Sequence, residues 1–330
     1  MESSRKTYID FLKFICITCI MLAHVESPDC IKMIRSFDVP MMVMLSSMLG
    51  RYSYSKYIGK KNGIIIYWKI RAKRLLIPTW SFLVIYFILQ IIFGKIRPIQ
   101  YYIASFALTR LAIGYVWIIR IYLLSSLLIP LFEKTSKTKK TAFFIVVLYV
   151  LYELAYHFGL DSNAFLDNTV FYIIPYGVIS YFGYIYSDIG QKCKTIIKYS
   201  SLVIFAIIFV LLKNVTGSFQ LLEVAKYPPR LYYLSYGVYV SFLLIGICER
   251  RQFNFFSNKL IVFVSKHSLP IYLYHILYLN LYSRVLPETE WFLEFVVVYS
   301  MSIITTYISN CIIDYVVAKC PKYDFLKYFK

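Results

Sequence analysis

Long apolar runs constrain the fold of this chain more than any other feature. Runs of about 18 to 22 residues recur from one end to the other, and each is long enough to cross a bilayer core of roughly 30 Å. The mean hydropathy is +0.63 and 59% of the 330 residues are hydrophobic, well above an ordinary soluble domain. The chain is therefore predicted to be an all-α, polytopic integral membrane protein.

About ten membrane-spanning helices around a central cavity are predicted, in a single transmembrane domain over residues 1–330 with no soluble domain outside the membrane. The first run is interpreted as a retained span, because it contains Asp10, Lys13 and His24 and no cleavage site for a signal peptidase follows. A half-apolar segment, 99–113, is predicted to be re-entrant or interfacial. The predicted spans are 11–26, 36–50, 75–94, 115–132, 141–158, 170–187, 196–213, 231–249, 259–280 and 292–318.

The distribution of basic residues predicts how the chain is oriented in the cell membrane. The two termini and the loops 51–74, 133–140, 188–198 and 249–259 together hold 24 Lys and Arg, whereas the alternate loops hold nine. Cytoplasmic loops carry the excess of Lys and Arg, so both termini are predicted to be cytoplasmic, which requires an even number of spans. The net charge of +19 is therefore attributed to topology and to anionic lipid headgroups, and not to nucleic acid.

Three ionisable residues share one face of the first predicted span. Lys13 and His24 lie about three helical turns, roughly 16 Å, apart, and Asp10 falls on the same stripe. An ionisable group inside a span is unfavourable unless it is paired or faces a wet cavity, so each is a functional candidate. The alternative is that Lys13 snorkels to cytoplasmic phosphates and His24 caps the outer end of the span. A snorkelling lysine does not require a histidine on its own face, which favours the functional interpretation.

A dense basic cluster precedes the third predicted span. Loop 51–74 has eight Lys and Arg in 24 residues and ends in KIRAKRLLIP, where Arg71 and Arg74 stand three residues apart. Side chains at i and i+3 of a helix point the same way, so the two guanidinium groups form a fork suited to phosphate oxygens. The alternative is an ordinary basic flank of a span. Because no Gly-rich nucleotide loop accompanies the cluster, side chains would have to hold an anionic ligand.

Two polar pairs lie in later predicted spans. Glu153 and His157 are four residues apart, and they are either a base with its orienting partner or a satisfied contact between helices. Ser268 and His275 flank Pro270 in HSLPIYLYH, where a helix broken at the proline is either a cavity wall or a plain kink.

The cysteines do not indicate a metal site. Cys16 and Cys19 form a C-x-x-C motif inside an apolar span, and no second pair of ligands accompanies it. Cysteine in an apolar segment packs as a small hydrophobic residue, so packing is the favoured role and no metal is predicted.

Five motifs follow one another between residues 5 and 280. They are RKTYIDFLKFICITCIMLAH, FDVPMMVMLSSMLGR, KIRAKRLLIP, VWII and HSLPIYLYH. In this order they resemble the acyltransferase-3 family of membrane acyltransferases, whose first span has an acid, a nearby Arg or Lys, and then a His. Two departures are Ser46-Ser47, where the family has Ser-Gly, and Val39 before the proline. These departures weaken the expectation of a close backbone approach in the second span.

The resemblance implies transfer of an acyl group, most often acetyl, from cytosolic acyl-CoA to a hydroxyl of a cell-surface or lipid-linked glycan. Acetyl-CoA would be a co-substrate, and no permanently bound cofactor is expected. Some members carry an additional extracytoplasmic hydrolase-like domain. This chain is expected to lack that domain and to act alone or with a separate partner, and its oligomeric state is left open.

The polar residues suggest how such a transfer would proceed. CoA is polyanionic at one end, and its pantetheine arm is comparable in length to the separation of Lys13 and His24. His24 is predicted to be the general base that takes the proton of the attacking hydroxyl, and a covalent acyl-histidine or acyl-serine is the alternative. The predicted site residues are His24, Asp10 and Glu153 for catalysis, Lys13, Arg71 and Arg74 for acyl-CoA, and Trp117, Ser268 and His275 for the acceptor.

A competing functional class is a transporter or flippase of lipid-linked glycans that uses the buried charges as a relay. Such a protein is expected to show internal repeats or paired broken helices, and we find neither in the sequence. A glycan polymerase is a third alternative, but it would call for a large outer loop, and the longest predicted here has about twenty residues. Membrane acyl transfer is therefore the favoured interpretation.

Overall fold

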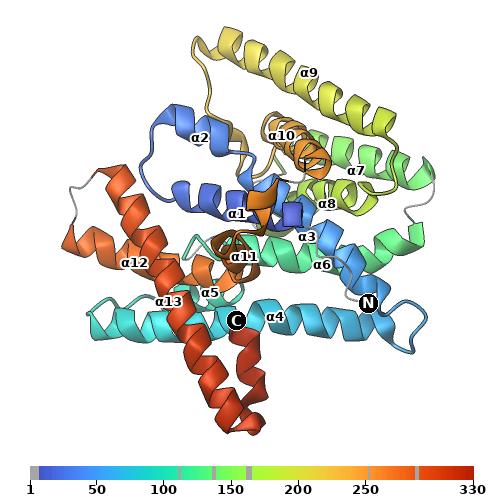
Figure 1. Cartoon of the computed structure of the whole chain (residues 1–330). Helices are drawn as coiled ribbons and strands as arrows, with labels where there is room; N and C mark the ends of the chain where they lie inside the picture. Colours follow the sequence, from blue (N-terminus) through green and yellow to red (C-terminus); the bar gives the residue numbers. More distant parts are fainter. Residues whose placement is uncertain (1–6, 111–112, 136–138, 161–165, 252, 287–289) are drawn as a thin grey trace. The chain divides into compact units, whose positions relative to one another are not determined.

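The computed structural model describes residues 7–110, 113–135, 139–160, 166–251, 253–286 and 290–330. Within these ranges the chain is helical and contains no strand, apart from one isolated bridge between Lys226 and Pro229 (Figure 1). The predicted all-α class is therefore confirmed for the described part of the chain.

The chain divides into two compact units, and each combines segments that are distant in sequence. The helices α4 (Gly63–Ile92) and α6 (Trp117–Thr135) contribute residues to both units. The first unit consists of Met1–Ser27, Lys69–Ile119 and Phe253–Lys330, and the second of Pro28–Trp68 and Arg120–Gln252.

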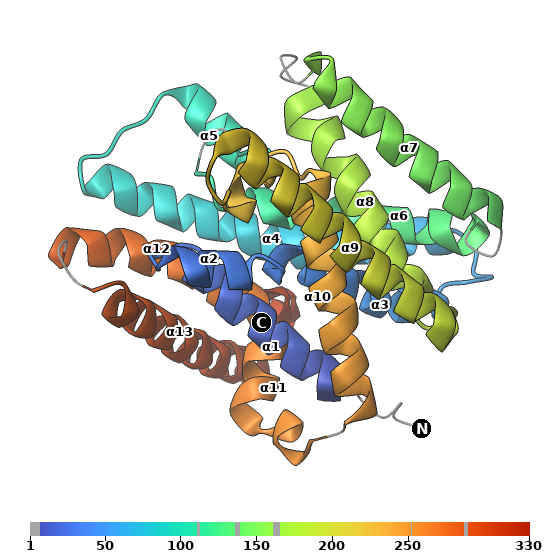
Figure 2. The same cartoon turned by 90° about the horizontal axis from the view of Figure 1, so that it is seen from above.

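The first unit is organised around its N-terminal helix. Helix α1 packs against α11, α12 and α13, and α12 lies along α13 (Figures 1 and 2). Besides parts of α4 and α6, the helices of this unit are α1 (Thr7–Leu22), α5 (Ile99–Phe106), α11 (Lys259–Lys266), α12 (Ser268–Val285) and α13 (Trp291–Lys319).

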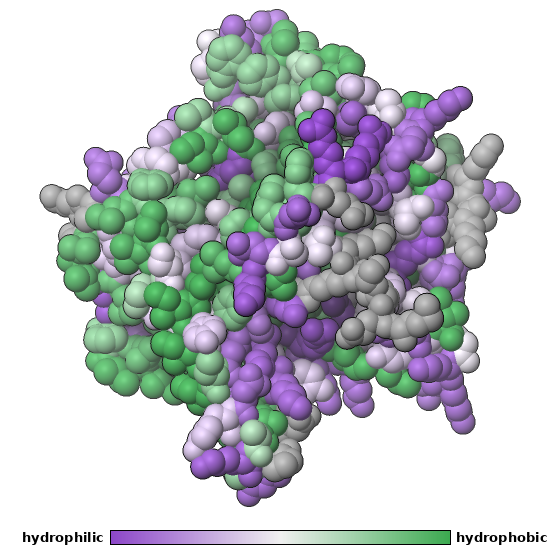
Figure 3. Space-filling view, in the orientation of Figure 1, coloured by the Kyte–Doolittle hydropathy of each residue, from purple (hydrophilic) through white to green (hydrophobic). Residues whose placement is uncertain are grey.

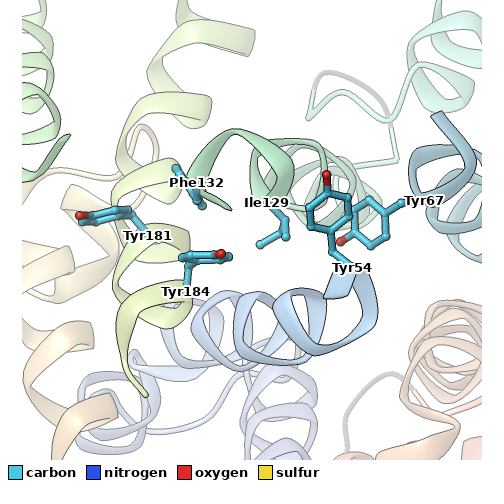
Figure 4. Packing of buried hydrophobic residues seen from close by; sticks show 6 residues of the cluster. All are labelled: Tyr54, Tyr67, Ile129, Phe132, Tyr181 and Tyr184. Atoms are coloured by element: carbon cyan, nitrogen blue, oxygen red, sulfur yellow. The ribbon is translucent and has the colours of Figure 1, made fainter. Parts of the chain in front are cut away.

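The second unit is built on α3, which packs against α8 and α10, while α10 also lies along α9 and α7 packs against α8. An aromatic cluster from α3, α4, α6 and α8 forms part of its core, and Figure 4 shows Tyr54, Tyr67, Ile129, Phe132, Tyr181 and Tyr184 in this cluster. The helices of this unit are α2 (Asp29–Arg35), α3 (Asp38–Ser55), α7 (Lys139–His157), α8 (Phe171–Ile185), α9 (Gln191–Thr216) and α10 (Leu231–Arg250).

Each of the ten predicted spans coincides with a helix or a helix pair, but fewer helices qualify as membrane spans. Among the described residues, five helices are long and apolar enough to cross a bilayer, and the number is six if the bent pair α11 and α12 is one span. The predicted number of about ten and the central cavity are not confirmed. Helices α1 and α8 have only 16 and 15 residues, shorter than the roughly 20 that a bilayer core requires.

The surface supports a membrane environment for the long helices. Helix α9 has none of its residues buried, although the mean hydropathy of its most apolar stretch is 2.3. Figure 3 shows broad apolar areas, in green, on the visible face of the molecule. Apolar surface on this scale must be covered by a protein partner or by lipid, and in a multi-pass membrane protein the bilayer covers it.

The late motif contains a sharp break between α11 and α12. The two helices are bent by 81° relative to each other, and His267 stands between them. Pro270 was the predicted break point, but it lies in the first turn of α12. In a continuous helix the ring of Pro270 would clash with the carbonyl of Lys266, four residues earlier, so the helix breaks before the proline. Proline is tolerated in the first turn of a helix, which is the position it has in α12.

Helices α3 and α8 approach each other closely, although α3 lacks the expected Ser-Gly pair. The buried Ser47 donates a hydrogen bond to the carbonyl of Ser180 at 2.6 Å. A Cβ on Gly183 would lie 2.3 Å from the carbonyl oxygen of Met44. Small residues and hydroxyl hydrogen bonds are the usual means by which membrane helices approach. The departure from Ser-Gly in α3 made a close backbone approach less expected, but the two helices do approach closely, because the small residue is Gly183 on α8.

We expect Gly183→Ala to destabilise the protein by about 1–3 kcal/mol, because the added methyl group would overlap the backbone of α3. Thermal unfolding of the purified protein in detergent measures the effect. The matched control is Gly246→Ala in α10, where a Cβ would meet nothing within 4 Å. Equal unfolding temperatures for the two variants would contradict the close approach of α3 and α8.

Candidate active site

His24 stands just beyond the end of α1, in a turn. The helix ends at Leu22, and the His24 amide donates to the carbonyl of Met21 at 3.1 Å. The helix therefore ends a few residues before residue 26, the predicted end of the span, and Lys13 and His24 do not stand on one continuous helix. An apolar run does not by itself mark a helix end, and Pro28 soon turns the chain toward α2.

A pair of histidines lies at this end of α1. Nε2 of His275 is 2.9 Å from Nδ1 of His24, and the two rings are stacked at 4.9 Å. His275 is fully buried in α12, and its Nδ1 is hydrogen-bonded to the carbonyl of Tyr272. The phenol of Tyr272 donates to the carbonyl of Tyr115 at 2.7 Å, and the Tyr115 ring meets His24 edge-on. The structure thus joins two predicted site residues that are 251 positions apart in sequence.

A polar cavity of about 560 Å³ lies beside His24, entirely within the first unit. Its wall includes three carboxylates, an amide and three hydroxyl groups, which can accept hydrogen bonds from a polyhydroxylated ligand. The indole of Trp291 adds an apolar ring. The lining residues are His24, Glu26, Tyr115, Leu279, Asn280, Tyr282, Ser283, Leu286, Glu290, Trp291 and Glu294.

Asp10 and Lys13 meet one residue of α11. The ammonium of Lys13 donates to the backbone carbonyl of Ser265 at 2.5 Å, and the hydroxyl of Ser265 donates to the Asp10 carboxylate at 2.6 Å. Asp10 and Ser265 are buried, whereas Lys13 is half-buried. The predicted stripe therefore holds α1 against α11, and this contact accounts for two polar groups that would be unfavourable in an apolar segment.

The remaining predicted residues of this unit occupy separate positions. On α4, Arg71 is half-buried and Arg74 is exposed. Trp117 is buried at the start of α6, two residues after Tyr115. Ser268 begins α12 and lies two turns, roughly 10 Å along the axis, from His275. The described lining of the cavity includes none of these four predicted residues, Arg71, Arg74, Trp117 and Ser268.

Glu153 belongs to the second unit and contacts the start of α10. Its carboxylate accepts hydrogen bonds from Arg230 Nε at 2.7 Å, from the Leu231 amide at 2.9 Å and from the Tyr149 phenol at 2.8 Å. Burial disfavours the charged form of Arg230, but the hydrogen bond and charge of Glu153 outweigh it and raise the pKa of Arg230. His157, the other member of the predicted pair, is exposed. Glu153 was predicted to be either a catalytic base or a satisfied contact between helices, and these three hydrogen bonds are those of a satisfied contact.

We expect Glu153→Ala to lower stability by about 1–3 kcal/mol, because the half-buried guanidinium of Arg230 and the first amide of α10 would lose their acceptor. Thermal unfolding measures this loss, and acyl transfer per folded molecule should stay unchanged. His157→Ala on the same helix is the control for stability. A fall in transfer per folded molecule without loss of stability would instead support the predicted catalytic role of Glu153.

Sequence reasoning missed several residues of this region, among them Tyr115, Ser265 and Glu294. Glu294 is an ionisable residue inside a predicted span, so the signal that singled out Lys13 would have found it too. Tyr115 and Ser265 are common residue types in membrane helices. Nothing local distinguishes them, and only their contacts with His24 and with Asp10 mark them.

Comparison with known proteins gives one match. A family model described as an acyltransferase domain, that of the acyltransferase-3 family, matches residues 6–311. No curated protein and no solved structure gives a significant match. Asp10, His24, Ser265, His275 and Glu294 all lie within the matched segment, which covers most of the chain.

Proposed function

The chain belongs to the acyltransferase-3 family, and from this premise we propose that it is a membrane O-acyltransferase that uses acetyl-CoA. The acceptor is a hydroxyl of a cell-surface or lipid-linked glycan. The observation that supports this proposal most strongly is the position of His24, an imidazole at the wall of a polar cavity and hydrogen-bonded to a second, buried imidazole.

In the proposed reaction His24 is the general base. The hydroxyl oxygen of the acceptor attacks the carbonyl carbon of the thioester while His24 takes the hydroxyl proton. The tetrahedral intermediate then collapses, the carbon–sulfur bond breaks, and the thiolate of CoA leaves. His24 returns the proton to the sulfur, so that the imidazole is neutral again and the products are the acyl ester and CoA.

The cavity beside His24 is the proposed site of the acceptor. Its volume of about 560 Å³ lies within the usual range for small-molecule sites. Carboxylates such as Glu26 and Glu294 accept hydrogen bonds from sugar hydroxyls, and Asn280 both donates and accepts. A wall of this composition suits a neutral polyhydroxylated ligand, since an anionic one would be repelled by the carboxylates.

Acyl-CoA is proposed to bind through Arg71 and Arg74 on α4, together with Lys13 on α1. Arg74 is exposed, so its guanidinium is accessible to a phosphate, and Arg71 lies three residues earlier on the same helix. These cations and His24 belong to the same unit. The proposed orientation, with the basic residues on the cytoplasmic side, follows from the distribution of loop charges.

The proposed function is tested by transfer of labelled acetyl from acetyl-CoA by membranes that contain the protein. Label should appear in the glycan fraction and should be released by mild base, as expected of an ester. Membranes without the protein are the control. If purified protein binds no acetyl-CoA and transfers no label, acyl transfer is excluded and the transport alternative is favoured.

A further inference from the structure

The buried histidine of α12 has a well-defined set of partners. His275 is 0% exposed, and each of its two ring nitrogens has its own hydrogen-bond partner. Nδ1 is hydrogen-bonded to the carbonyl of Tyr272, and Nε2 lies 2.9 Å from Nδ1 of His24. Tyr272 is itself held by the hydrogen bond from its phenol to the Tyr115 carbonyl.

The hydrogen-bond chemistry of this chain of groups has one consistent arrangement when both rings are neutral. A carbonyl oxygen can only accept, so Nδ1 of His275 carries its proton. The other nitrogen of a neutral imidazole is then an acceptor, so Nε2 of His275 accepts a hydrogen bond from Nδ1 of His24. The proton of His24 is consequently on Nδ1, and its Nε2 carries the lone pair.

We propose that His275 is a positioning residue that sets the tautomer of His24. It holds the His24 ring by one hydrogen bond and keeps Nε2 of His24 unprotonated. This inference rests on the proposed role of His24 as general base, because a base needs the free lone pair on the nitrogen that meets the substrate. When His24 takes the proton and becomes an imidazolium, the hydrogen bond to His275 stabilises it, as the carboxylate does in a Ser-His-Asp triad.

The position of His275 favours this role over the predicted contact with the acceptor. The cavity wall includes His24, Leu279 and Asn280 but not the fully buried His275 among its described residues. An imidazole with both nitrogens engaged inside the protein acts on the substrate through its neighbour. We therefore place His275 in the middle of a histidine relay, by which we mean the chain of hydrogen bonds from His24 through His275 to the carbonyl of Tyr272. No proton passes beyond His24.

Nitrogen-15 NMR of protein labelled at the histidine rings tests the tautomer directly. The chain has only four histidines, so the His24 signals are assigned by their absence from His24→Ala. At about pH 8, where an unperturbed imidazole is neutral, Nε2 of His24 should give the shift of an unprotonated nitrogen. A proton on Nε2, or on both nitrogens, would overturn the proposal.

Two substitutions of His275 separate positioning from packing. His275→Leu removes the acceptor, so the His24 tautomer should become mixed and kcat should fall roughly 10- to 100-fold with KM for the acceptor unchanged. His275→Gln keeps an amide oxygen that can accept from His24, so it should restore the tautomer and most of the rate. Tyr278→Phe is the control, since it removes a hydrogen bond to Thr305 from the same helix and leaves both histidines in place.

The outcomes distinguish this proposal from the proposed function. If His275→Leu changes neither the tautomer nor kcat, or if His275→Gln is as impaired as His275→Leu in both, the positioning role is wrong. If the NMR results agree but His24→Ala transfers acetyl normally, the histidine relay exists and the general base assignment fails. If Tyr278→Phe loses as much activity as His275→Leu, the effect is one of packing and the proposal is also rejected.

Discussion

His24→Ala is expected to lower acetyl transfer by about 10²- to 10⁴-fold, the usual contribution of a general base. The reason is that the variant leaves no proton acceptor at the place where the hydroxyl meets the thioester. Binding of acetyl-CoA should be nearly unchanged, because the nucleotide phosphates are proposed to contact α4 and not His24. Transfer from labelled acetyl-CoA and equilibrium binding, both on purified protein, give the two quantities.

The control for this substitution is His157→Ala, which removes an exposed histidine from α7 and should leave transfer unchanged. Equal amounts of folded protein are verified by thermal unfolding. Full transfer by His24→Ala would refute the general base assignment. Stable labelling of the protein itself in the absence of acceptor, lost in His24→Ala, would favour the acyl-histidine alternative over direct attack.

The double substitution Arg71→Gln and Arg74→Gln is expected to raise KM for acetyl-CoA about 10²- to 10⁴-fold, with kcat unchanged. Each guanidinium is proposed to make a charge-assisted hydrogen bond to phosphate, worth about 1.5–3 kcal/mol. Such contacts are equally strong in the ground and transition states, so their loss affects binding and not the chemical step. Initial rates over a range of acetyl-CoA concentrations measure both constants.

Acetyl-pantetheine gives a sharper comparison, because it has the thioester and the arm of acetyl-CoA without the nucleotide phosphates. The double variant should use acetyl-pantetheine as well as the unchanged protein does. Arg97→Gln, at an exposed arginine of the same unit in a loop predicted to be extracytoplasmic, should not affect KM for acetyl-CoA. An equal loss with both thioesters would show that the two arginines act on folding or on the chemical step.

The positions of most helices could be predicted from the sequence, but which of them span the membrane could not. Every predicted span contains a helix, because apolar composition is a local property. The end of α1 at Leu22 and the break at His267 differ from the predictions by a few residues. Helix ends depend on where the chain must turn to reach its next packing partner, which an apolar run does not record.

The candidate site was predicted only in part. His24, Lys13, Asp10 and His275 were singled out because polar groups in apolar segments are unfavourable without partners. Their partners could not be assigned in the same way. Ser265 is an ordinary residue in the sequence, and its importance appears only when its hydroxyl and carbonyl meet Asp10 and Lys13.

The sequence alone determined the helical membrane character of this protein, its family and most of the residues worth testing, because these follow from composition, spacing and the order of motifs. The tertiary structure alone decided which residues act together. Lys13 meets Ser265 across 252 positions, His24 meets His275 across 251, and Arg230 meets Glu153 across 77. Such pairs depend on which helix faces pack against each other, and helical periodicity specifies a face but not its partner.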